Sequence, residues 1–133
     1  ADIIAISEFT DERGLLIAAR PEKLIVPPEL MFVANRLLQT ELRVGTADND
    51  INSIRNMGSI PQGYRVNHFF TDADAYVIIT SINSTDGMKY FVRTPIATGM
   101  DGDFDTGNVR YKARERYSFG VSDPLGVYGS PGA

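Results

Sequence analysis

Residues 109–122 read VRYKARERYSFGVS, a stretch in which apolar and polar side chains alternate with a period of two. The one break in the alternation is Glu115, which falls on the apolar side. A period of two sends successive side chains to opposite faces of a β-strand, whereas a helix would spread the aromatic residues around its circumference. We therefore expect a long strand over 109–122 with one buried face, ended by a turn at 123–126.

Short apolar runs bounded by turn residues predict further strands upstream of this stretch. They lie at 3–9, 15–18, 24–26, 64–70, 75–82 and 88–94. Turn residues at 11–14 indicate a hairpin between the first two runs, and Asp86-Gly87 indicates another between the last two. Pro95 is expected to close the strand at 88–94.

One amphipathic helix is expected at 28–41. Pro28 suits the first turn of a helix, and Glu29 is favourable near a helix N-terminus. The apolar residues that follow at helical spacing are Leu30, Val33, Ala34, Leu37 and Leu38.

The segments between these elements are expected to be loops. They lie at 45–63, with a short element near 51–55, and at 97–107. Residues 129–133 are expected to form a small, flexible terminus. The whole pattern predicts an α+β fold with a mixed or antiparallel sheet and few helices.

Composition narrows the function classes. The chain has 133 residues, 43% of them hydrophobic and 23% charged, values that are typical of a globular domain. A formal charge of −4 argues against general nucleic-acid binding, although it leaves room for a local basic patch. The chain has no cysteine, which excludes disulfides and thiolate metal sites. No apolar run approaches the about 18 residues that a membrane-spanning helix needs, and no basic-then-apolar signal segment opens the chain.

An acidic loop offers one candidate metal site. Asp101, Asp103 and Asp105 alternate along a glycine-containing turn and could converge on a calcium ion. The EF-hand pattern requires Gly at the sixth position and Glu at the twelfth, where this chain has Thr106 and Lys112. A solvated acidic loop that faces a basic neighbour therefore explains the pattern better than a metal site does.

The polar side of 109–122 carries a basic row. Its members are Arg110, Lys112, Arg114 and Arg116. No aromatic side chains interleave with them on that face, so the stacking platform of a single-strand-binding protein is missing. We expect these cations to pair with acidic loops of the same or a neighbouring subunit and so to guide and register assembly. Asp48 and Asp50 are further candidates for a subunit interface.

Catalytic motifs are weak. His68 is the only histidine, no Gly-x-Ser-x-Gly elbow accompanies it, and a partly buried structural role is expected for it. Residues 58–63 contain Pro61 and lack the Gly-Lys-Ser/Thr ending of a phosphate-binding loop. We expect no enzyme activity and no cofactor.

Several segments, in order along nearly the whole chain, resemble the major capsid proteins of tailed phages and prophages. They lie at 21–30, 34–38, 45–52, 72–76, 87–91, 103–108, 112–123 and 126–130. The most specific of them joins DFDTGN at 103–108 to KARERYSFGVSD at 112–123.

The resemblance implies the Hong Kong-type, tailed-phage major-capsid fold. Residues 1–133 would be a single domain and the C-terminal part of a longer subunit, because the N-terminal arm, extended loop and spine helix of such subunits are not evident. They would comprise the axial domain plus the returning peripheral-domain strand, placed at 109–122.

The implied function is a structural subunit of an icosahedral head shell that self-assembles into pentamers and hexamers around the genome. Scaffolding or decoration proteins are implied partners, whereas sequence-specific nucleic acid and membrane are not. The implied location is the virion, and the bacterial host cytoplasm during assembly. Two alternatives come from the residues themselves, a small calcium-dependent binding module built on 101–107 and a hydrolase built around His68.

Overall fold

The computed structural model describes residues 2–42 and 50–132, and the chain divides into two compact units. The first, which we name the sheet unit, contains residues 1–87 and 123–133. The second, the hairpin unit, contains residues 88–122.

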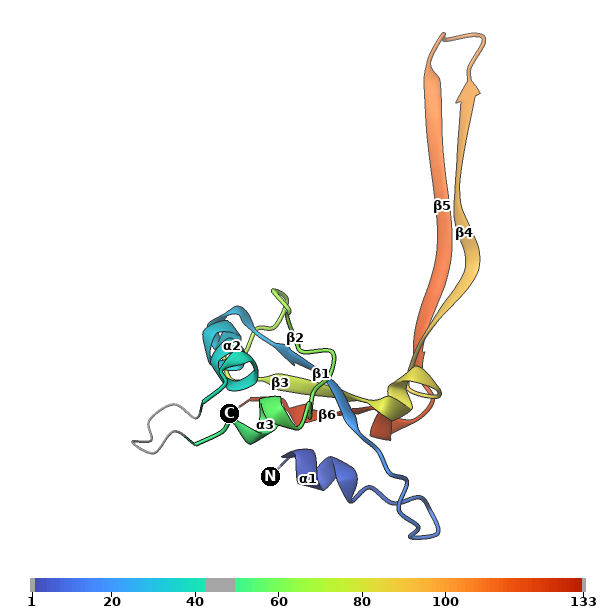
Figure 1. Cartoon of the computed structure of the whole chain (residues 1–133). Helices are drawn as coiled ribbons and strands as arrows, with labels where there is room; N and C mark the ends of the chain where they lie inside the picture. Colours follow the sequence, from blue (N-terminus) through green and yellow to red (C-terminus); the bar gives the residue numbers. More distant parts are fainter. Residues whose placement is uncertain (1, 43–49, 133) are drawn as a thin grey trace. The chain divides into compact units, whose positions relative to one another are not determined.

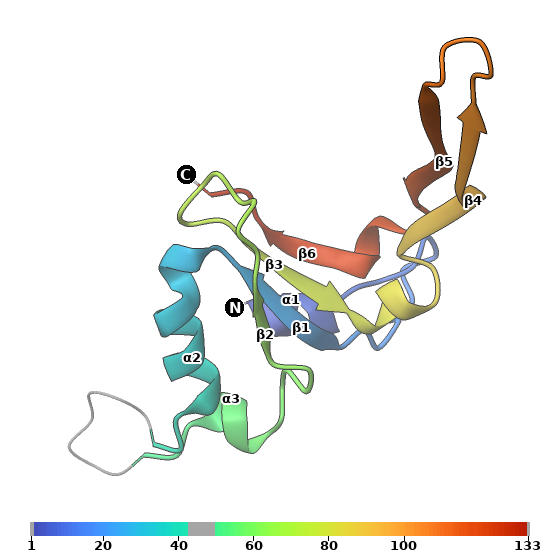
Figure 2. The ribbon, with the colours of Figure 1, turned by 90° about the horizontal axis from the view of Figure 1, so that it is seen from above.

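The sheet unit is built on a four-stranded mixed sheet in the order β2-β1-β3-β6 (Figures 1 and 2). The parallel pair is β1 with β2, and β3 is antiparallel to both β1 and β6. The strands are β1 (Pro21–Val26), β2 (Tyr64–Val66), β3 (Tyr76–Thr80) and β6 (Val127–Ser130). The strands predicted at 24–26, 64–70 and 75–82 are therefore confirmed, the second with only three residues.

Short helices accompany this sheet. The α-helices are α1 (Asp2–Ser7), α2 (Met31–Gln39) and α3 (Ser53–Asn56), and the 3-10 turns are η1 (Pro28–Leu30), η2 (Ser81–Ser84) and η3 (Pro124–Gly126). The helix predicted at 28–41 is confirmed as η1 followed by α2, and the short element predicted near 51–55 is α3. Part of the predicted loop at 45–63 lies outside the described residues.

The core of the sheet unit is apolar and draws on both helices and strands. Its buried residues are Ile6, Ala19, Leu24, Val26, Ala34, Leu38 and Ile78. Thr80 is the one buried polar residue among those the structure describes, and its hydroxyl donates a hydrogen bond of 2.8 Å to the carbonyl oxygen of Leu125. That bond joins the end of β3 to η3. It also satisfies the buried hydroxyl, which would otherwise lower the free energy of unfolding.

The predicted hairpin of 3–9 and 15–18 is wrong. Residues 2–7 form α1, and the strand predicted at 15–18 is reduced to an isolated bridge between Thr10 and Leu16. A short apolar run cannot be assigned to helix or strand by periodicity alone. In α1, Ile6 is buried against the core whereas Ile4 is exposed to solvent, so the helix has one buried and one exposed side. The turn at 11–14 is nevertheless present, with Gly14 at φ 79°.

The predicted pairing across Asp86-Gly87 is also wrong. The chain leaves β3 through η2, and the next strand, β4 (Met88–Gly102), pairs with β5 (Val109–Val121) in a separate two-stranded sheet. Most of the loop predicted at 97–107 is therefore strand. Pro95 does not close β4, because it lies at a register shift where the ladder to β5 is interrupted and no hydrogen bond is required of its nitrogen.

Residues 129 and 130 of the predicted flexible terminus lie in β6 instead. Gly129 makes this pairing with β3 possible, since a Cβ atom at this position would lie only 2.2 Å from the carbonyl oxygen of Tyr76. A turn-forming composition is therefore compatible with a strand when the partner backbone approaches closely.

At the level of fold class, the structure confirms an α+β protein with mixed and antiparallel sheets and few helices. The strand predicted at 109–122 is confirmed as β5. The prediction that one of its faces is buried is wrong, because its residues are exposed almost throughout. The single-domain organisation stays a prediction.

Candidate interaction surface

The hairpin unit is one long antiparallel ribbon (Figure 1). Its register runs from Met88 opposite Val121 to Gly102 opposite Val109. An isolated two-stranded hairpin is marginally stable in water and gains stability when a third strand or another surface covers its apolar face.

Aromatic residues cluster on one face of the ribbon. Tyr90 of β4 lies opposite Phe119 of β5, with ring centroids 5.2 Å apart. Tyr117 completes the cluster, with its ring centroid 5.6 Å from each of the other two. Such ring pairs support each other within the strand pair.

The aromatic cluster remains largely uncovered. The side chain of Phe119 is 75% exposed, and those of Tyr90 and Tyr117 are exposed by about half. The same face carries further exposed apolar side chains, namely Met88, Val92, Met100, Val109, Tyr111 and Val121. Phe91 and Ile96 are exposed too, but Phe91 pairs with Ser118 on the other face and Ile96 lies in the register shift. An exposed apolar surface of this kind, interrupted on β5 only by Glu115, is typical of a protein–protein contact. The aromatic face of 109–122 that the sequence predicts to be buried is therefore exposed within this chain.

The basic row lies on the opposite face of β5. In the ladder, Asp101 faces Arg110, Gly99 faces Lys112, Ala97 faces Arg114 and Thr94 faces Arg116. Within the part of the chain that the structure describes, none of these four cations has an ion pair, and all four are exposed. Their role as an assembly surface stays a prediction.

The tip of the hairpin is a turn organised by Asp103. The Asp103 Oδ1 atom accepts a hydrogen bond of 3.2 Å from the amide of Asp105, and its Oδ2 atom accepts one of 2.9 Å from the hydroxyl of Thr106. The Asp103 amide donates to the carbonyl oxygen of Asn108 at 2.9 Å. Phe104 stands fully exposed within this turn.

The acidic loop is thereby divided between two places. Asp101 is part of β4 opposite Arg110, whereas Asp103 and Asp105 belong to the turn. Among the described residues, no group of three or more His, Cys, Asp or Glu side chains is placed to hold a metal ion. The turn hydrogen bonds already account for both carboxylate oxygens of Asp103.

The remaining candidate residues are scattered. His68 lies exposed in the turn after β2, so the prediction of partial burial is wrong. Asp50 is exposed at the start of the segment leading to α3, and Asp48 lies outside the described residues. His68 and Asp50 belong to the sheet unit, whereas the basic row belongs to the hairpin unit.

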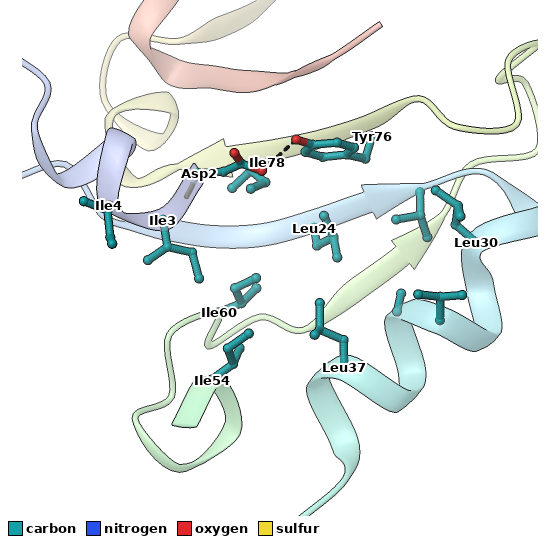
Figure 3. A pocket seen from close by; sticks show the side chains of 13 residues that line it. Asp2, Ile3, Ile4, Leu24, Leu30, Leu37, Ile54, Ile60, Tyr76 and Ile78 are labelled. Carbon is teal, nitrogen blue, oxygen red and sulfur yellow. Dashed lines mark hydrogen bonds between the residues drawn. The ribbon is translucent and has the colours of Figure 1, made fainter. Parts of the chain in front are cut away.

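An apolar groove runs along one face of the mixed sheet, between α1, α2 and α3 (Figure 3). Its volume is about 470 Å³, and Leu24 and Ile78 form its floor. Val33 and Leu37 of α2 line one side and are each about half exposed. On the α1 side, the Tyr76 hydroxyl donates a hydrogen bond of 2.6 Å to Asp2, which raises the pKa of Tyr76.

Sequence reasoning missed both the groove and the full ribbon. The alternation of Met88, Tyr90 and Val92 signals a strand whose apolar face matches that of β5. The alternation is interrupted at the register shift around Pro95, so the sequence does not show that β4 continues to Gly102. The groove has no local signal, because its walls come from segments far apart in the sequence.

Comparison with known proteins gave one match. The family model described as phage capsid protein matches residues 2–130, which is nearly the whole chain. Neither the curated proteins nor the solved structures contain a match. In the described part of the chain, every helix is too short or too polar to cross a membrane.

Proposed function

Because this chain belongs to the phage capsid protein family, we propose that it is a structural subunit of the icosahedral head shell of a phage or prophage. In this proposal, copies of the subunit assemble into pentamers and hexamers that enclose the genome. The family is one of structural proteins of the virion, and its members assemble into a shell.

The main observation that supports this proposal is the exposure of both faces of the hairpin unit. A ribbon with an aromatic face on one side and a row of cations on the other, exposed on both, suits an element that is covered by neighbouring subunits. A shell subunit needs such contacts and does not need an active site. The groups that could support catalysis or metal binding are dispersed over the described residues.

The finer assignment follows the Hong Kong-type capsid fold. We assign the sheet unit to the axial domain, which surrounds five-fold and six-fold positions, and β5 to the strand that returns to the peripheral domain. Scaffolding or decoration proteins are further partners in this proposal. Assembly takes place in the host cytoplasm.

Charge reversal along the basic row tests the proposal. In the protein that carries this sequence, replacing Lys112, Arg114 and Arg116 with Glu should abolish or strongly reduce shells seen by electron microscopy. The fold should survive, because all three side chains are exposed. Circular dichroism and thermal melting of the variant should therefore resemble those of the unmodified protein.

The matched control reverses three exposed cations of the sheet unit, Arg13, Arg20 and Arg65, which changes the net charge equally. Shells should still form from this control. If the unmodified protein yields no closed particles under any assembly condition, the capsid proposal is lost. If both triple variants assemble normally, the basic row is only a solvated face.

A further inference from the structure

We propose that the outer face of α2 binds the sheet unit of a second copy, with Arg36 meeting an acidic side chain of that copy. We define the α2 outer face by its exposed residues Phe32, Val33, Arg36 and Leu37. The inference rests on the proposed function in one respect, namely that copies of this chain associate. It adds the face that makes the contact, the unit of the second copy that it meets and the charge that determines the partner.

The helix α2 is apolar on two sides. Its inner side packs into the core of the sheet unit through Ala34 and Leu38, which are both buried. On the α2 outer face, Phe32 is 76% exposed, and Val33 and Leu37 are each exposed by about half. Residues three or four apart are neighbours on a helix surface, so these side chains form one continuous patch. A helix that is apolar on both sides is typical of a buried position, and we therefore expect the assembly to cover this patch.

A hollow of about 320 Å³ lies along the α2 outer face, and the residues that line it are Val33, Arg36, Leu37, Thr40 and Asn52. The side-chain amide of Asn52 donates hydrogen bonds to the carbonyl oxygens of Leu37 at 2.9 Å and Thr40 at 3.0 Å. The Thr40 hydroxyl donates to the carbonyl oxygen of Arg36 at 2.6 Å. The polar side chains at this end of the hollow are thus engaged within the chain, whereas the Arg36 guanidinium is exposed.

The charge of Arg36 determines which partner fits. Over residues 2–42 and 50–132, Arg36 has no ion pair and is the one charged residue of the hollow. A guanidinium pairs best with a carboxylate, which it can bind through two N–H donors at once. The sheet unit contains thirteen Asp or Glu and seven Lys or Arg, whereas the hairpin unit contains four and six. A second sheet unit therefore offers Arg36 more carboxylates and a more favourable net charge than a second hairpin unit does.

The same charge disfavours pairing of two α2 outer faces with each other. The patch spans less than two helical turns, so a two-fold contact would bring Arg36 of both copies close together, and like charges in a contact are unfavourable. The α2 outer face therefore meets a different surface of the second sheet unit. A contact between two different surfaces repeats from copy to copy and generates a ring when the rotation closes. Rings of sheet units are what pentamers and hexamers require.

Photocrosslinking tests which unit of the second copy the α2 outer face meets. The chain has no cysteine, so Asn35→Cys provides one attachment point for a benzophenone on the exposed side of α2, next to Arg36. Illumination of the associated protein should give a covalent dimer. Peptide mapping should place the crosslinked residue of the second copy within 1–87 or 123–133. His68→Cys is the control, because His68 is exposed elsewhere on the sheet unit and should give no dimer.

Substitutions on the α2 outer face test the charge and the apolar contact separately. Arg36→Glu reverses the charge, and Phe32→Ser removes an apolar side chain that is largely exposed. We expect sedimentation velocity to show at least tenfold weaker association for each variant, with melting temperatures close to that of the unmodified chain. Arg36→Lys should weaken association less than Arg36→Glu, because the charge remains. Arg20→Glu is the matched control, since it reverses another exposed cation of the sheet unit and should leave association unchanged.

Four results would overturn the contact: an unmodified chain that stays monomeric, variants that associate as tightly as the unmodified chain, no dimer from Asn35→Cys, or crosslinks confined to residues 88–122. Failure of the capsid proposal is scored separately, by the absence of closed particles in electron microscopy. Closed particles that form normally from both Arg36→Glu and Phe32→Ser would leave the shell function standing and exclude this contact.

Discussion

At the scale of single residues, the hydrogen bond from Tyr76 to Asp2 makes stability depend on pH. The bond, followed by burial and the charge of Asp2, raises the pKa of Tyr76 above its ordinary value of about 10. The protonated phenol is therefore the form that the folded state favours. Its contribution is fully present below about pH 10 and is lost as pH rises through the raised pKa.

Tyr76→Phe should accordingly lower the free energy of unfolding by about 1 kcal/mol near neutral pH. The difference from the unmodified chain should shrink towards zero in strongly alkaline solution. Urea unfolding followed by circular dichroism at several pH values measures both effects. Tyr111→Phe is the control, because Tyr111 is 80% exposed and should show no such difference. A Tyr76→Phe difference that is constant with pH would contradict the assignment.

Gly129 gives a second prediction at this scale, based on the close approach of β6 to β3. A Cβ atom at position 129 would lie 2.2 Å from the carbonyl oxygen of Tyr76, so Gly129→Ala should force the strands apart. We expect a loss of about 2 kcal/mol in the free energy of unfolding, the size typical of overpacking. Gly99→Ala, also in a strand but with no atom within 4 Å of the added carbon, should be nearly neutral. Equal melting temperatures for the two variants would contradict this account.

At the scale of elements, the aromatic face of the hairpin should contribute to association more than to folding. Phe119 is 75% exposed, so Phe119→Ser removes little that is buried within the chain. We expect the melting temperature to change by a few degrees at most and association to weaken at least tenfold. Phe69→Ser is the matched control, since Phe69 is 92% exposed on the sheet unit and should leave association unchanged. A large drop in melting temperature for Phe119→Ser alone would show that this face supports the fold itself.

The sequence predicted elements well where one local signal was strong. The alternation over 109–122 identified β5, and the apolar spacing after Pro28 identified α2. Prediction from the sequence failed where an element is determined by packing or pairing with residues that are distant in the sequence. Residues 2–7 form a helix in which Ile6 packs into the core, and β4 continues past Pro95 because the pairing with β5 shifts register there. Burial of one face of β5 was inferred from alternation, but alternation does not say whether the cover comes from the same chain.

For the candidate surface, the basic row could be named in advance because it is contiguous in sequence. The groove could not, because Leu24, Val33 and Ile78 meet only through the order of the strands and helices. The exposure of Phe104 could not be predicted either, because a phenylalanine between two aspartates is compatible with a buried position and with an exposed one at a hairpin tip.

At the scale of the whole molecule, charge is divided unevenly along the chain. The formal charge of +2 on residues 88–122 and of −6 on the remainder predicts that the hairpin unit of one copy attracts the sheet unit of another. Association measured by light scattering should therefore slow as salt is raised from about 0.05 M to about 0.5 M, because the screening length falls several-fold. The melting temperature of the isolated chain serves as the control and should change little. Association that strengthens with salt would assign the contact to apolar surface alone.

The proline in β4 has a consequence for the time that a subunit spends unassembled. A ribbon with two open edges is a template on which stray strands, including those of nascent chains, can add and propagate into fibres. Pro95 lacks an amide hydrogen, so a foreign strand cannot continue its hydrogen bonds unbroken along β4. The row of like charges on β5 opposes stacking of identical ribbons in register. The same ribbon that offers so much surface to its proper neighbours is therefore poorly suited to seeding amyloid while it waits for them.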